Sequence, residues 1–162
     1  MTLIAQNRER IAAIRQSKTY SLEPTLEYRA MQQAKQAARA EDLQINFQDS
    51  TVSIAETRLI KIVEELLDNA FKFSSKGTPV ILTTSVNEDI FILSVTNQGR
   101  GMTREQIARI GAYMQFERKL YEQQGSGLGL ILCKYIAELF GGKLTIESIP
   151  DRETTVRVYL SV

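Results

Sequence analysis

The sequence predicts an α+β domain built as a two-layer sandwich, with about three helices on one face of a mixed sheet of about five strands. The first observation is that helical and strand-like patterns are mixed along the chain without alternating one for one, which disfavours a doubly wound parallel sheet. The second is the length, since 162 residues match one ordinary globular domain. The third is the composition, 43% hydrophobic and 24% charged, which is typical of a folded soluble protein.

The strongest helical pattern runs from Glu56 to Ser74, where apolar residues recur at three- and four-residue intervals. Weaker patterns predict helices over residues 1–18, from Pro24 onward, after the capping-box spacing Thr103–Gln106, and between the glycines at 125–129 and Gly141-Gly142.

Strands are predicted where apolar and polar residues alternate. Val80 to Val86 and Ile90 to Val95 flank the turn at 87–89, so we expect them to be antiparallel neighbours. Further alternations lie at Leu43–Phe47, Val52–Ile54, Leu144–Ile146 and Val156–Leu160. The segment 111–124 has weak periodicity and many polar residues, which predicts a long loop or a lid.

Composition excludes several classes of chemistry. The chain contains no His, so a Ser-His-Asp triad, a Cys-His pair and an imidazole base cannot form within it. The single cysteine, Cys133, cannot form an internal disulfide, and zinc clusters are excluded, so a reducing, cytoplasmic setting is expected. A net charge of +1 argues against a broad nucleic-acid footprint. No window approaches the length of a membrane span, and the charged N-terminus does not suit a signal peptide.

The helix from Glu56 carries the first candidate site. Glu65 and Asn69 are four residues apart and therefore project from one helical face, with Lys72 three residues further on. Carboxylate and amide oxygens are ligands that Mg²⁺ prefers, and a lysine can contact phosphate oxygens. A solvated helix face remains an equally open interpretation of this segment alone.

The second candidate is VTNQGRGM, residues 95–102, which runs off the end of a predicted strand. Gly99 and Gly101 would let the backbone pass close to a flat ligand. The side-chain oxygen of Asn97 can accept a hydrogen bond from an amino group such as that of adenine. A plain turn between strand and helix is the alternative.

The third candidate is GSGLGL, residues 125–130, at a helix start. Free backbone N–H groups and the positive end of the helix dipole can bind an anion there. The segment is not a Walker loop, because no Gly-Lys-Ser/Thr follows, and no strand leads directly into it as in a Rossmann fingerprint. On its own it does not separate an anion site from an ordinary helix start.

Taken in order, these three motifs and the polar lid closely resemble the ATP-binding domain of sensor histidine kinases. That family belongs to the superfamily of gyrase, Hsp90 and MutL-type ATPases, whose domains have the Bergerat ATP-binding fold. The match runs from about Leu22 to Val162. It implies an N-terminal helix over residues 1–18, similar to the tail of a dimerisation helix, followed by an ATP-binding domain over residues 19–162.

The resemblance implies ATP and Mg²⁺ as ligands and a role for each matching residue. Asn69 corresponds to the Mg²⁺-coordinating Asn, Lys72 to the phosphate-contacting Lys, and Glu65 to a position that is Asn in many kinases and a catalytic Glu in the ATPases. Phe116 resembles the aromatic residue of the lid, with Arg118 a phosphate contact, and Thr155 is expected near the adenine. The remaining implied nucleotide contacts are Phe73, Asn97, Gly99, Gly101, Met102, Gly125, Ser126, Gly127, Leu128 and Gly129.

Two departures bear on function. Asn97 stands where the family has an Asp that recognises adenine, and the missing charge is expected to weaken binding by about 1 kcal/mol. The chain also lacks the phosphoacceptor His, so that His must lie on a dimerisation domain elsewhere or in trans, with a response regulator downstream. The alternatives are a non-catalytic nucleotide sensor or docking module, favoured by these same departures, and a freestanding ATPase, favoured by Glu65.

Overall fold

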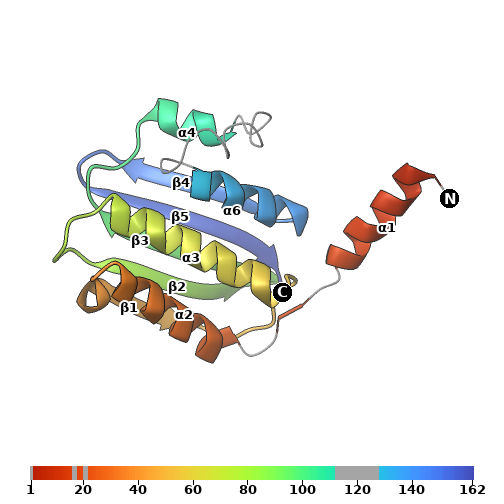
Figure 1. Cartoon of the computed structure of the whole chain (residues 1–162), viewed down its shortest axis with the longest axis horizontal. Coiled ribbons are helices and arrows are strands. Elements are labelled where there is room, and N and C mark those ends of the chain that lie inside the picture. The colour runs from red at the N-terminus through yellow and green to blue at the C-terminus, as the bar shows by residue number, and fades with distance from the viewer. Residues whose placement is uncertain (1, 16–17, 20–21, 112–127) are drawn as a thin grey trace.

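The computed structural model describes residues 2–15, 18–19, 22–111 and 128–162, and they form the predicted two-layer α+β sandwich (Figure 1). One sheet has the strand order β1-β2-β3-β5-β4. Its strands are Leu43–Phe47 (β1), Val80–Asn87 (β2), Ile90–Gln98 (β3), Lys143–Ile149 (β4) and Glu153–Ser161 (β5). The sheet is mixed, because β1 runs parallel to β2 while the other neighbouring pairs are antiparallel.

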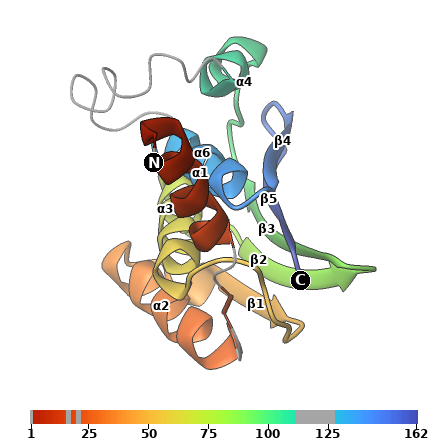
Figure 2. The same cartoon turned by 90° about the vertical axis from the view of Figure 1, so that its right-hand side faces the viewer.

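The helices lie largely on one face of this sheet. They are Leu3–Arg15 (α1), Leu22–Gln36 (α2), Glu56–Lys72 (α3), Arg104–Gly111 (α4) and Leu128–Leu139 (α6), with a short 3-10 turn at Ala40–Asp42 (η1). Helix α3 packs between α2 and α6, and the view turned by 90° shows these helices together on one side of the sheet (Figure 2). In contrast, Figure 1 shows α1 projecting away from the body, and Leu3 and Ile4 on it are 72% and 68% exposed.

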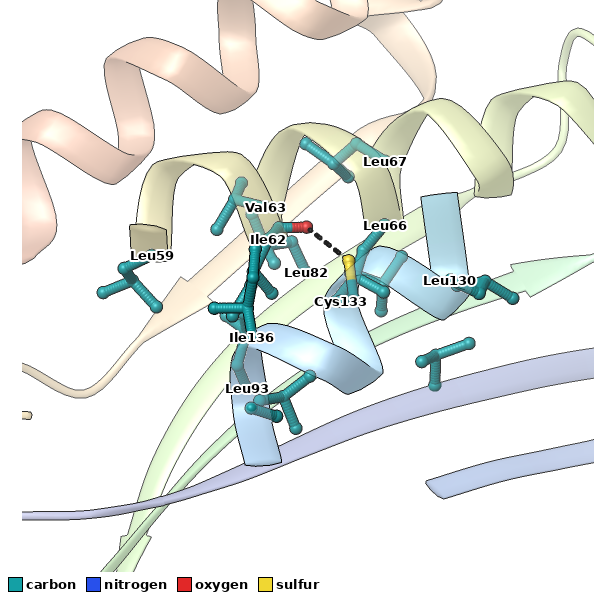
Figure 3. Close-up of a cluster of buried hydrophobic side chains, with 14 of the residues drawn as sticks. Leu59, Ile62, Val63, Leu66, Leu67, Leu82, Leu93, Leu130, Cys133 and Ile136 are labelled. Carbon is teal, nitrogen blue, oxygen red and sulfur yellow. Dashed lines mark hydrogen bonds between the residues drawn. The ribbon is translucent and has the colours of Figure 1, made fainter. Parts of the chain in front are cut away.

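The core lies between the helices and the sheet. The apolar stripe of α3 is buried, and it packs on the rows of alternate residues that the central strands turn towards it. Ile62 and Cys133 mark the contact between α3 and α6, where the thiol donates a hydrogen bond to the Ile62 carbonyl over 3.7 Å (Figure 3). Burial raises the pKa of the Cys133 thiol well above its ordinary value, so this group is a neutral core residue.

The predicted strand at Val52–Ile54 is wrong. Both side chains are fully buried, but Val52 makes only an isolated antiparallel bridge with Thr19. The next backbone N–H, that of Ser53, donates instead to the Ser161 carbonyl at the end of β5. The alternation of apolar residues therefore reports burial of an irregular segment whose hydrogen bonds go to two different partners.

Arg39 joins the end of α2 to the loop after α3. Its side chain is only 5% exposed and forms a salt bridge with Asp42. The guanidinium donates hydrogen bonds to the backbone carbonyls of Phe71, Ser74 and Thr78 over 3.1 to 3.3 Å. It also lies over the Phe71 ring, 5.3 Å from the centroid. One buried cation thus holds the carboxyl-terminal end of α3 in place.

Candidate functional site

The carboxyl-terminal half of α3 presents the first group of predicted site residues. Glu65 and Asn69 are half-buried and Lys72 is exposed, at the spacing that places them along one flank of the helix. The buried stripe of the same helix faces the sheet. The helix therefore carries the acidic, amide and basic groups along one flank beside the core.

Glu65 already has partners within the chain. Lys61 Nζ lies 2.8 Å from Glu65 Oε1, and this hydrogen bond raises the pKa of Lys61. The other carboxylate oxygen lies against Gly129, where an added Cβ would overlap it. Gly129 is in the first turn of α6, so the carboxylate sits beside the amino-terminal end of that helix, which favours negative charge. The absence of a side chain at Gly129 therefore allows α6 to pack closely against α3.

Asn97 is a deeply enclosed polar residue of the site. It is the penultimate residue of β3, its side chain is 3% exposed, and it belongs to the row of alternate β3 residues that faces the helices. Its amide nitrogen Nδ2 is buried and has no hydrogen-bond partner among the described residues. A buried amide without a partner costs about 1 to 3 kcal/mol, so this group indicates a place for a ligand atom.

Gly99 and Gly101 bring the chain close to itself. A Cβ at Gly99 would overlap the Phe73 carbonyl oxygen, and Gly99 forms an isolated bridge with Ser74 just after α3. Gly101 has φ of 75°, and a Cβ there would lie 2.6 Å from Ser148 Oγ. The glycines predicted for close approach to a flat ligand therefore also permit close approach of two other chain segments.

The residues around these glycines connect α3 to the end of β3. Phe73 caps α3 through its N–H, which donates to the Asn69 carbonyl, and its ring is half-buried. The Arg100 guanidinium lies 4.7 Å from the centroid of that ring. Met102 is 7% exposed, and its N–H donates to Ser148 Oγ over 2.9 Å. The amide-bearing helix and the Asn97 strand end are thus held together by the chain itself.

Thr155 lies on the opposite face of the sheet from Asn97. In the register of β3 and β5, Asn97 pairs with Thr154, whereas Thr155 pairs with Thr96. The hydroxyl groups of Thr155 and Thr96 are 2.9 Å apart on that opposite face. Because neighbouring residues of a strand point to opposite faces, Thr154 and not Thr155 accompanies Asn97.

Sequence reasoning missed two hydroxyl groups on the Asn97 side. Thr154 Oγ1 and Ser148 Oγ are 2.8 Å apart on the paired strands β5 and β4. Ser148 in turn accepts the N–H of Met102. Their signal in the sequence is weak, since isolated Ser and Thr residues in strands are common and only the strand register shows that these two lie on the Asn97 side.

Several predicted residues lie outside the described part of the chain. These are Phe116, Arg118, Gly125, Ser126 and Gly127, together with most of the predicted lid. Leu128 and Gly129 are described and open α6. In the described ranges, no group of three or more His, Cys, Asp or Glu residues could hold a metal ion by itself.

The structure thus combines a mixed sheet, helices largely on one face of it, and the Asn69 and Asn97 amides on α3 and at the end of β3. The chain belongs to the family described as "Histidine kinase-, DNA gyrase B-, and HSP90-like ATPase", which matches residues 54–162. This confirms the predicted resemblance and ATP as the nucleotide of the family.

Among named relatives, the chain is 36% identical over 110 residues to the histidine protein kinase DivJ of Caulobacter vibrioides, covering 67% of this chain and 18% of the relative. It is 32% identical over 131 residues to the alginate biosynthesis sensor protein KinB of Pseudomonas aeruginosa, covering 79% of this chain and 22% of the relative. The chain thus spans about a fifth of the length of these curated relatives.

The solved mycobacterial sensor histidine kinase MprB shares the fold, with a TM-score of 0.72 at 22% sequence identity, over 90% of this chain and 97% of that one. This similarity confirms the predicted fold class. None of the helices in the described ranges is both long and apolar enough to cross a membrane.

Proposed function

We propose that this chain binds Mg-ATP and presents the γ-phosphate to a His side chain that another domain or another chain supplies. Family membership and the sensor-kinase relatives support this proposal. The observation that carries it is the buried, unpartnered amide of Asn97, on a strand end that the bridge between Gly99 and Ser74 joins to the end of α3. This joins a buried hydrogen-bonding group to a helix flank that carries an amide and a cation.

The base would lie at Asn97, whose carboxamide hydrogen-bonds the purine edge. Gly99, Gly101 and Met102 would form the adjoining wall, and the half-buried Phe73 ring would border it. Thr154 replaces Thr155 in this proposal, because the strand register places Thr154 on the Asn97 side. The neutral Asn97 would bind a base through hydrogen bonds alone.

The phosphates would lie along the polar flank of α3. The half-buried Asn69 amide oxygen is a hard ligand that suits Mg²⁺, and phosphate oxygens would complete the coordination. Bound Mg²⁺ would neutralise charge on the β- and γ-phosphates. Lys72 would contact phosphate oxygens, and we propose the same for Arg118 and for the glycine turn 125–129.

Transfer would break the bond between the γ-phosphorus and the oxygen bridging it to the β-phosphate, and form a phosphorus–nitrogen bond to the imidazole. The chain contains no His, so the imidazole must come from outside it. Glu65 would polarise the attacking nitrogen while its carboxylate also accepts the hydrogen bond from Lys61. A response regulator would then receive the phosphoryl group, and a cytoplasmic location would suit this sequence of reactions.

Calorimetric titration tests the metal role of Asn69. We expect Asn69→Ala to weaken ATP binding at least about tenfold in Mg²⁺, while the affinities of variant and parent converge in EDTA. Asn46→Ala, at an exposed position of β1, is the matched control and should bind as the parent does. Unchanged Mg-ATP affinity in Asn69→Ala would refute the assignment.

The observation that Asn97 is neutral, together with the absence of His, favours one second candidate, a non-catalytic nucleotide sensor or docking module. Radiolabelled ATP and a His-bearing dimerisation segment from a sensor kinase separate the two functions. Label on that His supports the kinase. Intact ATP binding with no label on His supports the sensor.

A further inference from the structure

We infer that the base site accepts 6-oxopurine nucleotides as well as ATP, and that Asn97 is the residue that determines this specificity. The inference rests on the proposed function, since it concerns the same site. It follows from the position of the Asn97 carboxamide, from the state of its polar neighbours, and from the hydrogen-bonding capacity of an amide.

Asn97 interrupts an apolar row. The helix-facing residues of β3 are Phe91, Leu93 and Val95, each 2% exposed or less, and Asn97 follows them at 3%. An apolar side chain at this position would continue the core without the cost of burying an amide. Asn97 is polar nonetheless, and it lies where this row reaches the edge of the core, beside the end of α3.

The polar groups nearest to Asn97 in the sheet are already engaged. On one side its strand partner is Val80, which has no polar side chain. On the other side it is Thr154, whose hydroxyl pairs with Ser148, and Ser148 also accepts the Met102 N–H. Within the described chain, Nδ2 is therefore a buried donor that is left for a bound molecule.

A carboxamide presents one donor and one acceptor side by side, which match the edge of either type of purine. Adenine presents a donor at its 6-amino group and an acceptor at N1. Hypoxanthine and guanine present the reverse, an acceptor at O6 and a donor at N1. Because no hydrogen bond among the described residues holds Nδ2, a half-turn of the amide exchanges its two atoms and fits either edge. A carboxylate at this position could only accept hydrogen bonds, and its negative charge would repel the O6 atom of a 6-oxopurine.

The test compares equilibrium binding of ATP and inosine triphosphate by calorimetry, for the whole chain in Mg²⁺. Inosine triphosphate differs from ATP at the purine edge alone, in its 6-oxo group and the proton at N1. In the parent chain we expect dissociation constants within about tenfold of each other. In Asn97→Asp we expect the preference for ATP over inosine triphosphate to widen at least about tenfold, because the donor is lost.

Two further variants serve as controls for this comparison. Asn87→Asp makes the same substitution at an exposed position at the far end of β2, and should leave the ratio of the two affinities unchanged. Asn97→Leu continues the apolar row and should therefore fold even where Asn97→Asp does not. We expect it to weaken both nucleotides at least about fivefold with their ratio near one, because both hydrogen bonds are lost.

The outcomes separate this inference from the proposed function. If the parent binds ATP but rejects inosine triphosphate by more than about a hundredfold, the specificity inference is overturned while the proposed function stands. The same holds if Asn97→Leu binds both nucleotides as tightly as the parent. If the parent binds neither nucleotide, the proposed function fails and this inference fails with it.

Discussion

Arg39 is a buried cation whose bonds join the end of α3 to the loop that follows it and to Asp42. Its guanidinium spans three backbone carbonyls and the Asp42 carboxylate, which is more than one ammonium group can reach at once. Asn69 and Phe73 lie on or next to the helix turn that Arg39 holds. The proposed phosphate and base contacts therefore depend on Arg39, although Arg39 would contact neither the phosphates nor the base.

We expect Arg39→Lys to lower the free energy of unfolding by about 2 kcal/mol, because the charge is kept while buried carbonyls lose their donors. Urea denaturation measures the change. Arg29→Lys is the control, since Arg29 is half exposed and lies 3.9 Å from Glu64, and it should change stability by less than about 0.5 kcal/mol. Equal effects of the two substitutions would contradict the role of Arg39.

Two glycines allow close packing of neighbouring elements at the site, but they face different kinds of atom. Gly99 faces the backbone of Phe73 and Ser74, which cannot move without displacing the end of α3. Gly129 faces the tip of the Glu65 side chain, which can rotate. The two glycines are both in sequence motifs for nucleotide binding, yet the structure gives them different tolerances.

Gly99→Ala should destabilise the fold by about 2 kcal/mol, because its Cβ would meet backbone atoms. Gly129→Ala should cost less than about 1 kcal/mol, because Glu65 can move aside and alanine favours the helix. Thermal denaturation followed by circular dichroism compares them. A larger loss in Gly129→Ala would show that Glu65 is held rigidly.

Helix α3 could be predicted closely, over Glu56–Ser74 against the observed Glu56–Lys72, because an amphipathic pattern depends only on local spacing. The placement of Glu65 and Asn69 on one flank of that helix follows from the same local geometry. Alternation with Val156 and Val158 places Thr154 on the apolar face of β5, but the pairing of Thr154 with Asn97 could not be predicted. Two adjacent threonines point to opposite faces of β5, and only the tertiary register with β3 decides which of them accompanies Asn97.

The strand-like pattern of Val52 and Ile54 failed for a related reason. Alternation reports burial, but a strand also needs a neighbour for several successive residues, and this segment has a single bridge.

Arg39 was missed because an arginine near a helix end is ordinarily solvated, and its burial comes from the loop that folds over it.

Acid should reduce the stability of the whole molecule through Asp42. Hydrogen bonds from Arg39 and from the Gly77 N–H hold the pKa of Asp42 below its ordinary value of 3.8. The carboxylate therefore contributes stability at pH values above about 4, and this contribution is lost as the pH falls through the lowered pKa.

At neutral pH we expect Asp42→Asn to unfold at lower urea concentration than the parent, with the difference shrinking as the pH falls below about 4. Urea denaturation at several pH values measures this. Asp89→Asn, in the exposed turn between β2 and β3, is the control. A difference that grows on acidification would contradict the assignment to Asp42.

The position of Cys133 has a practical consequence. It is the only cysteine of the chain, it is fully buried between α3 and α6, and its thiol stays protonated. Thiol reagents attack the thiolate, so the folded chain should resist them. A cysteine introduced on an exposed flank of α3 would then be the single reactive point, and a fluorophore attached there could report nucleotide arrival without prior removal of the native sulfur.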